Sequence, residues 1–224
     1  MSPDAPPSVA MTASSMMSMF TLIELLWAEF YQDFPEIKFS LTEGDVGWIP
    51  YFLWRAEHVY NRHSGWTNAT FPEGYSGPSD VFKNHMYTCF ISDKVGVRNM
   101  EWFNEDMLCW ESDFPHSDSN WPFAPEDVIE TMGHLDDAVI NKITHENAMN
   151  AYSFEPFKYI PVEHARAGYL RSQAADVDVV THVGRKASQR DRDAWARMTA
   201  FAQAQQPTTA EAVKIADRSA TLGN

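Results

Sequence analysis

Three short apolar runs, each followed by polar residues and then by a stretch with helical spacing, constrain the fold more than any other feature. The runs are Lys38–Thr42, Met86–Ile91 and Met107–Trp110. No tight hairpin turn joins one run to the next. Strands that alternate with helices in this way form a parallel sheet with helices packed outside. The sequence therefore predicts an α/β fold with three parallel strands.

Helical spacing of apolar residues predicts the elements around these strands. A proline ends the first helix, and Pro50 fits the first turn of the second. Glycine, proline, threonine and asparagine mark a long loop between the second helix and the second strand. The predicted helices are Val9–Phe34, a helix from about Ile49, Val95–Phe103, Pro125–Met132 and Asp136–Tyr152, and the predicted loop is Gly65–Pro78.

The apolar stretch from Met16 to Ala28 is predicted to be a deeply packed helix and not a membrane span. Polar residues interrupt it, and it is shorter than the ~20 residues that a span requires. No lysine or arginine precedes Lys38, so the charged region of a signal peptide is missing. We therefore expect no membrane partner and a cytoplasmic location. Cys89 and Cys109 lie inside apolar runs, without CxxC or Cys/His zinc spacing, and are expected to be buried thiols.

The charge balance argues against a nucleic-acid partner. The chain has 17 basic and 31 acidic residues, a formal net charge of −14, and nothing basic enough to release phosphate counterions. Residues 1–164 carry 8 basic and 25 acidic side chains, whereas residues 165–224 carry 9 and 6. We predict a body at residues 1–154 and a C-terminal extension at 155–224 that is mostly helical or disordered.

Asp113 follows the third apolar run at the position where parallel α/β proteins place their chemistry. A carboxylate there can bind a divalent metal or accept a proton from a metal-bound water. It can equally be a helix N-cap or a loop-capping residue, and its spacing leaves both interpretations open. Pro115 stiffens the next turn, so His116 is expected to face the same mouth. His116 and Asp118 are candidate ligands or substrate contacts, with a solvated loop as the alternative.

Glu43 occupies the equivalent position after the first run, directly before Gly44 and Gly47. If the strands are parallel neighbours, Glu43 and Asp113 open onto the same face. Two converging acids suit general acid/base catalysis. The glycines would let the backbone approach a ligand, although glycines are common in such turns without one.

The other histidines are predicted to be structural. His85 precedes its strand and so lies at the opposite face, which in barrels serves stability. His145 is expected to pack or to cap a helix. Ser117 lacks a glycine elbow, which removes support for a serine hydrolase. The remaining histidines lie on helix surfaces, in loops or near the tail: His58, His63, His134, His164 and His182.

The segments Trp110–Pro122, Leu41–Pro50 and Ile143–Ala148 together resemble the amidohydrolase-related family. This is the branch of metal-dependent (β/α)₈ hydrolases that includes aminocarboxymuconate-semialdehyde decarboxylase. The resemblance runs from about Ser2 to Phe154. It implies a partial TIM-type barrel: the helix after strand five, then strands six, seven and eight.

The resemblance also implies a divalent metal, usually zinc, with Asp113 as ligand and proton handler. Such enzymes often have a histidine on strand six, where this chain has Glu43. The family's His-x-His pair and its strand-five histidine are absent from the sequence. Because a catalytic zinc normally takes three protein ligands, we expect no tight metal binding by this chain alone.

Two functions follow as hypotheses. In the first, the chain is the C-terminal part of an enzyme that hydrolyses or decarboxylates a small carboxylic or aromatic compound. It would be a truncated fragment, or would be completed by a separate N-terminal half-barrel chain. Asp113 and Glu43 would be catalytic, and His116 and Asp118 would contact substrate. In the second, a non-catalytic half-barrel acts through self-association or partner binding.

Overall fold

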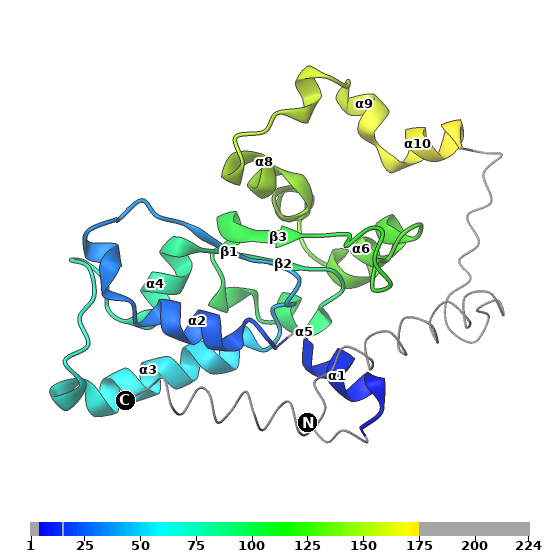
Figure 1. Cartoon of the computed structure of the whole chain (residues 1–224). Helices are drawn as coiled ribbons and strands as arrows, with labels where there is room; N and C mark the ends of the chain where they lie inside the picture. The colour runs from blue at the N-terminus through cyan, green and yellow to red at the C-terminus, as the bar shows by residue number, and fades with distance from the viewer. Residues whose placement is uncertain (1–4, 15, 175–224) are drawn as a thin grey trace, which may run out of the picture. The chain divides into compact units, whose positions relative to one another are not determined.

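A computed structural model describes residues 5–14 and 16–174 of the chain. They belong to one structural unit. Its centre is a parallel sheet in the order β1 (Phe39–Leu41), β2 (Met86–Phe90) and β3 (Leu108–Trp110) (Figure 1). Each strand lies within a predicted run. The prediction of an α/β fold with three parallel strands is confirmed.

The helical elements lie before, between and after the strands. In chain order they are α1 (Pro7–Ser14), α2 (Met19–Leu26), η1 (Glu29–Gln32), α3 (Ile49–Thr67), α4 (Pro78–His85), α5 (Lys94–Val97), η2 (Met100–Trp102), η3 (Glu105–Met107), α6 (Ala124–Met132), α7 (Asp137–Asn141), η4 (Lys142–Glu146), α8 (Asn147–Ala151), η5 (Pro156–Lys158), α9 (Val162–Ala165) and α10 (Ala167–Gln173).

One face of the sheet is covered by α2, α3 and α4, which pack against one another below the strands in Figure 1. Side chains of β2 and β3 meet the apolar sides of these helices. Burial of one large apolar side chain stabilises the fold by roughly 1.5–3 kcal/mol, because the side chain is removed from water. The core includes Leu22, Leu26, Ile49, Leu53, Val81, Phe82, Met86, Phe90 and Leu108.

The opposite face of the sheet is lined by polar and small side chains. Ser40, Tyr87, Cys89 and Cys109 border an open cleft of about 550 Å³, with α8 along one side. Neither β1 nor β3 has a strand partner on its outer edge within residues 5–14 and 16–174. Within the described residues, the sheet thus has one face covered by helices and two edges without a strand partner.

The predicted helix Asp136–Tyr152 is built from α7, one π-helical turn (η4) and α8. The side chain of Asn147 holds this segment beside β3 through hydrogen bonds. Its Nδ2 donates to the carbonyl oxygens of Glu105 and Leu108, each at 2.7 Å, and the residue is 2% exposed. The amide thus satisfies a carbonyl on the unpaired edge of the strand.

The predicted N-terminal helix Val9–Phe34 is wrong in two respects. The structure divides it into α1, α2 and η1, with an extended residue at Ala28 before the last turn. The stretch Met16–Ala28, which was predicted to be deeply packed, is also largely exposed, since Leu22 and Leu26 are its only fully buried positions among the described residues of α1 and α2. The apolar residues outnumber the positions that face the core, so Met17 and Phe20 remain exposed.

The same segment, Pro7–Leu26, is long and apolar enough to cross a membrane by length and composition alone. A core helix or a signal sequence would pass this test as well. The predicted absence of a membrane partner therefore stays a prediction.

Further differences concern the connections. The predicted loop Gly65–Pro78 begins later, because α3 continues to Thr67, and α4 was not predicted. The predicted helix Val95–Phe103 consists of the short α5 and η2. The predicted extension from residue 155 includes η5, α9 and α10, and its remainder lies outside the described residues.

Candidate metal and active site

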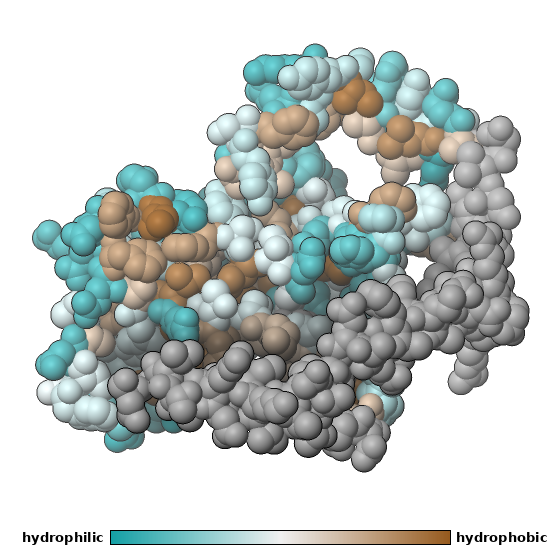
Figure 2. All heavy atoms as spheres, in the orientation of Figure 1, coloured by the Kyte–Doolittle hydropathy of each residue, from teal (hydrophilic) through white to brown (hydrophobic). Residues whose placement is uncertain are grey.

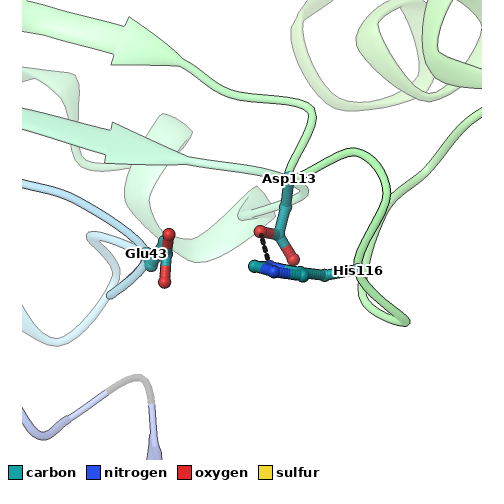
Figure 3. Close-up of side chains that lie close together, drawn as sticks. All are labelled: Glu43, Asp113 and His116. Carbon is teal, nitrogen blue, oxygen red and sulfur yellow. Dashed lines mark hydrogen bonds and ion pairs between the residues drawn. The ribbon is translucent and has the colours of Figure 1, made fainter.

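The loops after β1 and β3 bring Glu43, Asp113 and His116 together. Each offers one ligand atom, and the three atoms lie within 4.8 Å of one another. Figure 3 shows Glu43 on one loop and the other two residues on a second loop. Nδ1 of His116 lies 2.7 Å from Oδ1 of Asp113. The convergence expected for Glu43 and Asp113 at the carboxyl end of the sheet is therefore present.

Left-handed backbone conformations aim the acidic side chains of this corner. The φ angles are 56° at Glu43, 48° at Asp45 and 51° at Asp113. Aspartate adopts this region more readily than most residues, whereas glutamate has no such advantage. At Glu43 the conformation costs on the order of 1 kcal/mol, which the surrounding contacts must offset.

Glu111 joins the two loops and was missed by the sequence analysis. Its Oε1 accepts a hydrogen bond from the backbone N–H of Glu43 at 2.9 Å. Burial raises the pKa of Glu111, and the nearby carboxylates of Glu43, Asp113 and Asp45 raise it further. Its position two residues before Asp113, on the same side of the strand end, was the signal that could have revealed it.

Asp93 anchors the loop that carries Glu43. One carboxylate oxygen accepts from the backbone N–H groups of Val46 and Gly47 at 2.8 and 2.5 Å, and the other accepts from Gly96 at 2.8 Å. A Cβ atom at Gly96 would lie 2.4 Å from a methyl group of Val46. The loops after β1 and β2 therefore fit together only with glycine at this position.

Asp118 lies in the same corner as Glu43. It lines a hollow of about 250 Å³ together with Glu43, Asp45, Glu111 and residues of α1. Burial raises the pKa of Asp45, with smaller contributions from Asp93 and Asp118. Asp118 is not one of the three clustered donors, but it shares this hollow with Glu43, which is one of them.

Hydrophilic side chains gather where the loop after β3 and α6 lie (Figure 2). Among the described residues, Lys94 and Arg171 pair with acids of α6, whereas Glu43, Asp45 and Glu111 have no ion-pair partner and Asp113 contacts only His116. The charge of the acids there is thus not balanced by lysine or arginine. Such a local field favours a bound cation.

Histidines predicted to be structural lie away from this cluster. His85 is fully buried directly before β2, between the carbonyl of Ile37 and the hydroxyl of Tyr75. The ring of His58 stacks on Trp54, and His145 meets Phe157 edge-on. The structural interpretation of His85 is confirmed. His182 lies outside the described residues.

The chain has the class of α/β architecture in which binding sites lie at the carboxyl ends of parallel strands, and here acids and a histidine occupy that position. A sequence profile of the amidohydrolase family matches residues 10–154. The match covers more than half of the chain, and the chain belongs to the amidohydrolase family. The resemblance noted in the sequence is thereby confirmed.

Two solved structures illustrate the likeness. 5-Carboxyvanillate decarboxylase from Sphingomonas paucimobilis is 16% identical, with a TM-score of 0.52 over 63% of this chain and 41% of that one. Dihydroxybenzoic acid decarboxylase from a Polaromonas species, with bound manganese and the inhibitor 2-nitroresorcinol, is 18% identical, with a TM-score of 0.46 over 74% and 49%. The chain thus spans less than half the length of either. No curated protein matches it.

The family is one of metal-dependent enzymes, and the donor set of this site fits a divalent cation. Two carboxylates and one imidazole are suitable ligands for such ions. The side chain of Asp113 is 11% exposed and that of His116 is 67% exposed. Asp113 is therefore the potential ligand whose side chain is held most firmly by its surroundings. His116 and Glu43 reach the site from solvent-exposed positions.

Proposed function

We propose that this chain supplies the C-terminal part of a metal-dependent amidohydrolase-family enzyme that hydrolyses or decarboxylates a small carboxylic or aromatic compound. The observation that carries the proposal is the convergence of Glu43, Asp113 and His116 at the carboxyl ends of the strands. The family assignment supports the metal dependence. The likeness in fold to 5-carboxyvanillate decarboxylase favours the second reaction.

In this proposal Asp113 holds the metal, zinc being the expected ion, and handles a proton. When bound, the ion would supply Lewis-acid polarisation of a substrate oxygen or of water. Glu43 lies beside Asp113 and would accept a proton from the substrate or donate one to it. His116 would orient Asp113 through its hydrogen bond and contact the substrate with its second ring nitrogen. Asp118, which lines the same hollow as Glu43, would also contact the substrate.

The remaining metal ligands would come from an N-terminal half-barrel, on a separate chain or on a preceding part of the same one. The unpaired edges of β1 and β3 support this proposal because they are the positions where further parallel strands would add. The open cleft on the uncovered face supports it as well. The chain matches only 41% of the decarboxylase with which it superimposes.

The experiment that tests the function pairs the full chain with an N-terminal half-barrel carrying a His-x-His pair. The reading frame upstream of codon 1 is the first source, and a neighbouring gene is the second. Metal content by mass spectrometry and CO₂ release from hydroxybenzoate-type acids would be measured for each chain and for the pair. We expect about one metal ion per pair and turnover only in the pair. Absence of both from every pair would overturn the proposal.

Exposed aromatic residues on α3 favour the second candidate, a non-catalytic half-barrel that associates with itself. Tyr51, Trp54 and Trp66 are 61%, 51% and 71% exposed, and Tyr51 packs against Trp54. Apolar surface of this kind often marks an interface. Sedimentation velocity over a range of concentrations tests this candidate. If the chain associates with itself, the wild-type chain should sediment as a dimer and Trp54→Glu as a monomer. A wild-type chain that sediments as a monomer at every concentration would contradict this candidate.

A further inference from the structure

A second hollow lies among the helical elements around the end of β3. Its volume of about 760 Å³ falls in the usual range of small-molecule pockets. Its walls come from α6, from the π-helical turn η4, and from the segment that contains η5, α9 and α10. Trp110 is the single strand residue in its lining, so these walls are not the sheet edges to which a half-barrel would add. Glu43, Asp113 and His116 do not line it.

The lining of this hollow is mainly apolar. It includes Val128 and Ile129 from α6, together with Phe157, Ile160 and Val162 from the later segment. Ile129 is 65% exposed and Val162 is 41% exposed, so this surface meets water in the chain as it stands. A ligand with an apolar body would remove the surface from water, which favours binding. Because most of these side chains are aliphatic, a flexible alkyl chain matches them well.

Arg166 brings a positive charge to this apolar lining. Among the described residues it pairs with no carboxylate, whereas Arg171 is held by both oxygens of Glu126, each at 2.6 Å. The pair of Arg171 with Glu126 links α10 to α6 and so joins two walls of the hollow. The guanidinium of Arg166 remains for a ligand. It fits a carboxylate, to which it can donate two parallel hydrogen bonds.

The turn η4 contributes a second polar group, His145, to the lining. The hydroxyl of Thr144 donates to the carbonyl oxygen of Ile140 at 2.8 Å, and its oxygen lies 3.2 Å from Nδ1 of His145. Nδ1 therefore donates to Thr144. Nε2 has no hydrogen-bond partner in the part of the chain that the structure describes, and it is left for a ligand. Turns of the π-helical kind occur frequently at functional sites.

We propose that this hollow binds an aliphatic carboxylate of the medium-chain fatty acid type. The alkyl chain lies against α6 and η5, and the carboxylate meets Arg166. When its ring is protonated, His145 donates a further hydrogen bond to the carboxylate from Nε2. Binding involves no covalent or redox step. The site needs only residues of this chain and does not depend on the proposed enzymatic function.

Decanoate is the probe for the charged part of the site, and isothermal titration of the full chain measures its affinity. We expect one binding site per chain. Arg166→Gln should weaken binding by about tenfold or more, which corresponds to the loss of a hydrogen bond between charged groups. Arg62→Gln, at an exposed position of α3, is the control and should bind as the parent does. The neutral 1-decanol should bind the parent at least about tenfold more weakly than decanoate.

The apolar wall is tested by a second pair of variants. Ile129→Glu should weaken decanoate binding by about tenfold or more, because it places a negative charge against the ligand. Val95→Glu changes a similarly exposed apolar side chain on α5, 60% exposed, and should leave the affinity unchanged. Asp113→Asn should also bind decanoate as the parent does, which separates this site from the proposed active site.

A further measurement uses the wild-type chain and so does not depend on how variants fold. Decanoate should slow cleavage by trypsin after Arg166, as read by peptide mass spectrometry, whereas cleavage after Arg62 should keep its rate. Unchanged cleavage after Arg166 would overturn the proposal. So would equal affinity of the parent for decanoate and 1-decanol, equal affinity of the parent and Arg166→Gln for decanoate, or the absence of binding.

Discussion

Oδ1 of Asp113 lies 2.7 Å from Nδ1 of His116, three residues later in the same loop. The carboxylate accepts the Nδ1 proton, so Nε2 is the nitrogen left to meet a ligand. A histidine fixed through one nitrogen by a carboxylate is a common arrangement beside metal ions. Here the carboxylate is also the better positioned metal ligand of the two, because the side chain of Asp113 is six times less exposed than that of His116.

The first prediction is that Asp113→Asn weakens metal binding by more than about 100-fold in a reconstituted barrel. Changes around metal ligands alone cost roughly 10–100-fold, and this change removes a charged donor. Asparagine tolerates the φ of 51°, so the loop should keep its shape. Isothermal titration with Zn²⁺ measures the affinity. Asp137→Asn, at the exposed start of α7, is the control and should bind as the parent does. Unchanged affinity in Asp113→Asn would exclude Asp113 as a ligand.

The second prediction concerns Asp93, which organises the site without belonging to it. Asp93→Ala would leave the N–H groups of Val46, Gly47 and Gly96 without their acceptor. Hydrogen bonds to a charged group contribute about 1.5–3 kcal/mol each at most, and water can replace part of the loss. We expect the free energy of unfolding to fall by about 3 kcal/mol in urea denaturation.

A matched substitution separates the anchoring role of Asp93 from general surface effects. Asp80→Ala removes a carboxylate that accepts only from Ser76 at an exposed position. We expect that variant to lose no more than about 1 kcal/mol. Equal losses in the two variants would contradict the role given to Asp93.

The three strands could be predicted because each is a compact apolar run followed by polar residues. Their parallel order followed from the helices between them. The convergence of Glu43 and Asp113 followed in turn, since carboxyl ends of parallel strands share one edge. These inferences depend only on the local pattern of apolar residues and on the rule that strands joined through helices run parallel.

Other features depended on long-range contacts that no local pattern reveals. Glu111 acts through the backbone N–H of Glu43, 68 positions earlier in the chain. Asp93 caps the start of α5 and also accepts from the backbone of a loop 46 residues earlier in the chain, a contact that the sequence does not reveal. The N-terminal helix was predicted to be buried because its composition is apolar, but burial depends on how much surface the sheet offers to it. In α2, only Leu22 and Leu26 are fully buried.

The third prediction is a pH effect from Glu111. Burial raises its pKa above the ordinary 4.5, so folding favours the protonated form. Its stabilising contribution is complete below pH 4.5 and is lost as pH rises through the raised pKa. Glu111→Gln removes the charge and keeps an oxygen that can accept from Glu43 N–H. The variant should be more stable than the parent at pH 7 and should lose that advantage below pH 4.5.

Thermal unfolding at pH 4 to 8 measures this difference. Glu130→Gln is the control, because Lys94 lowers the pKa of Glu130 at an exposed position. That variant should gain no stability at pH 7. A Glu111→Gln variant that is less stable than the parent across the whole range would contradict the prediction.

The fourth prediction is an opposite pH effect from His85. Burial lowers its pKa below the ordinary 6.5, although the carbonyl of Ile37 acts in the other direction. The neutral ring donates from Nδ1 to Ile37, 2.8 Å away, and accepts from the hydroxyl of Tyr75 at 2.9 Å. Folding thus favours the neutral form. This contribution is complete above pH 6.5 and is lost as pH falls through the lowered pKa.

His85→Gln tests this effect because it removes the titration while retaining a polar side chain. Its free energy of unfolding should be lower at pH 8 by about 1–3 kcal/mol, since a buried polar partner is lost. Below pH 6.5 it should decline less steeply than that of the parent. His134→Gln, at an exposed position, should follow the parent at every pH. If His85→Gln and the parent declined with equal slope between pH 6.5 and 5, the buried histidine would not be the source of the acid sensitivity.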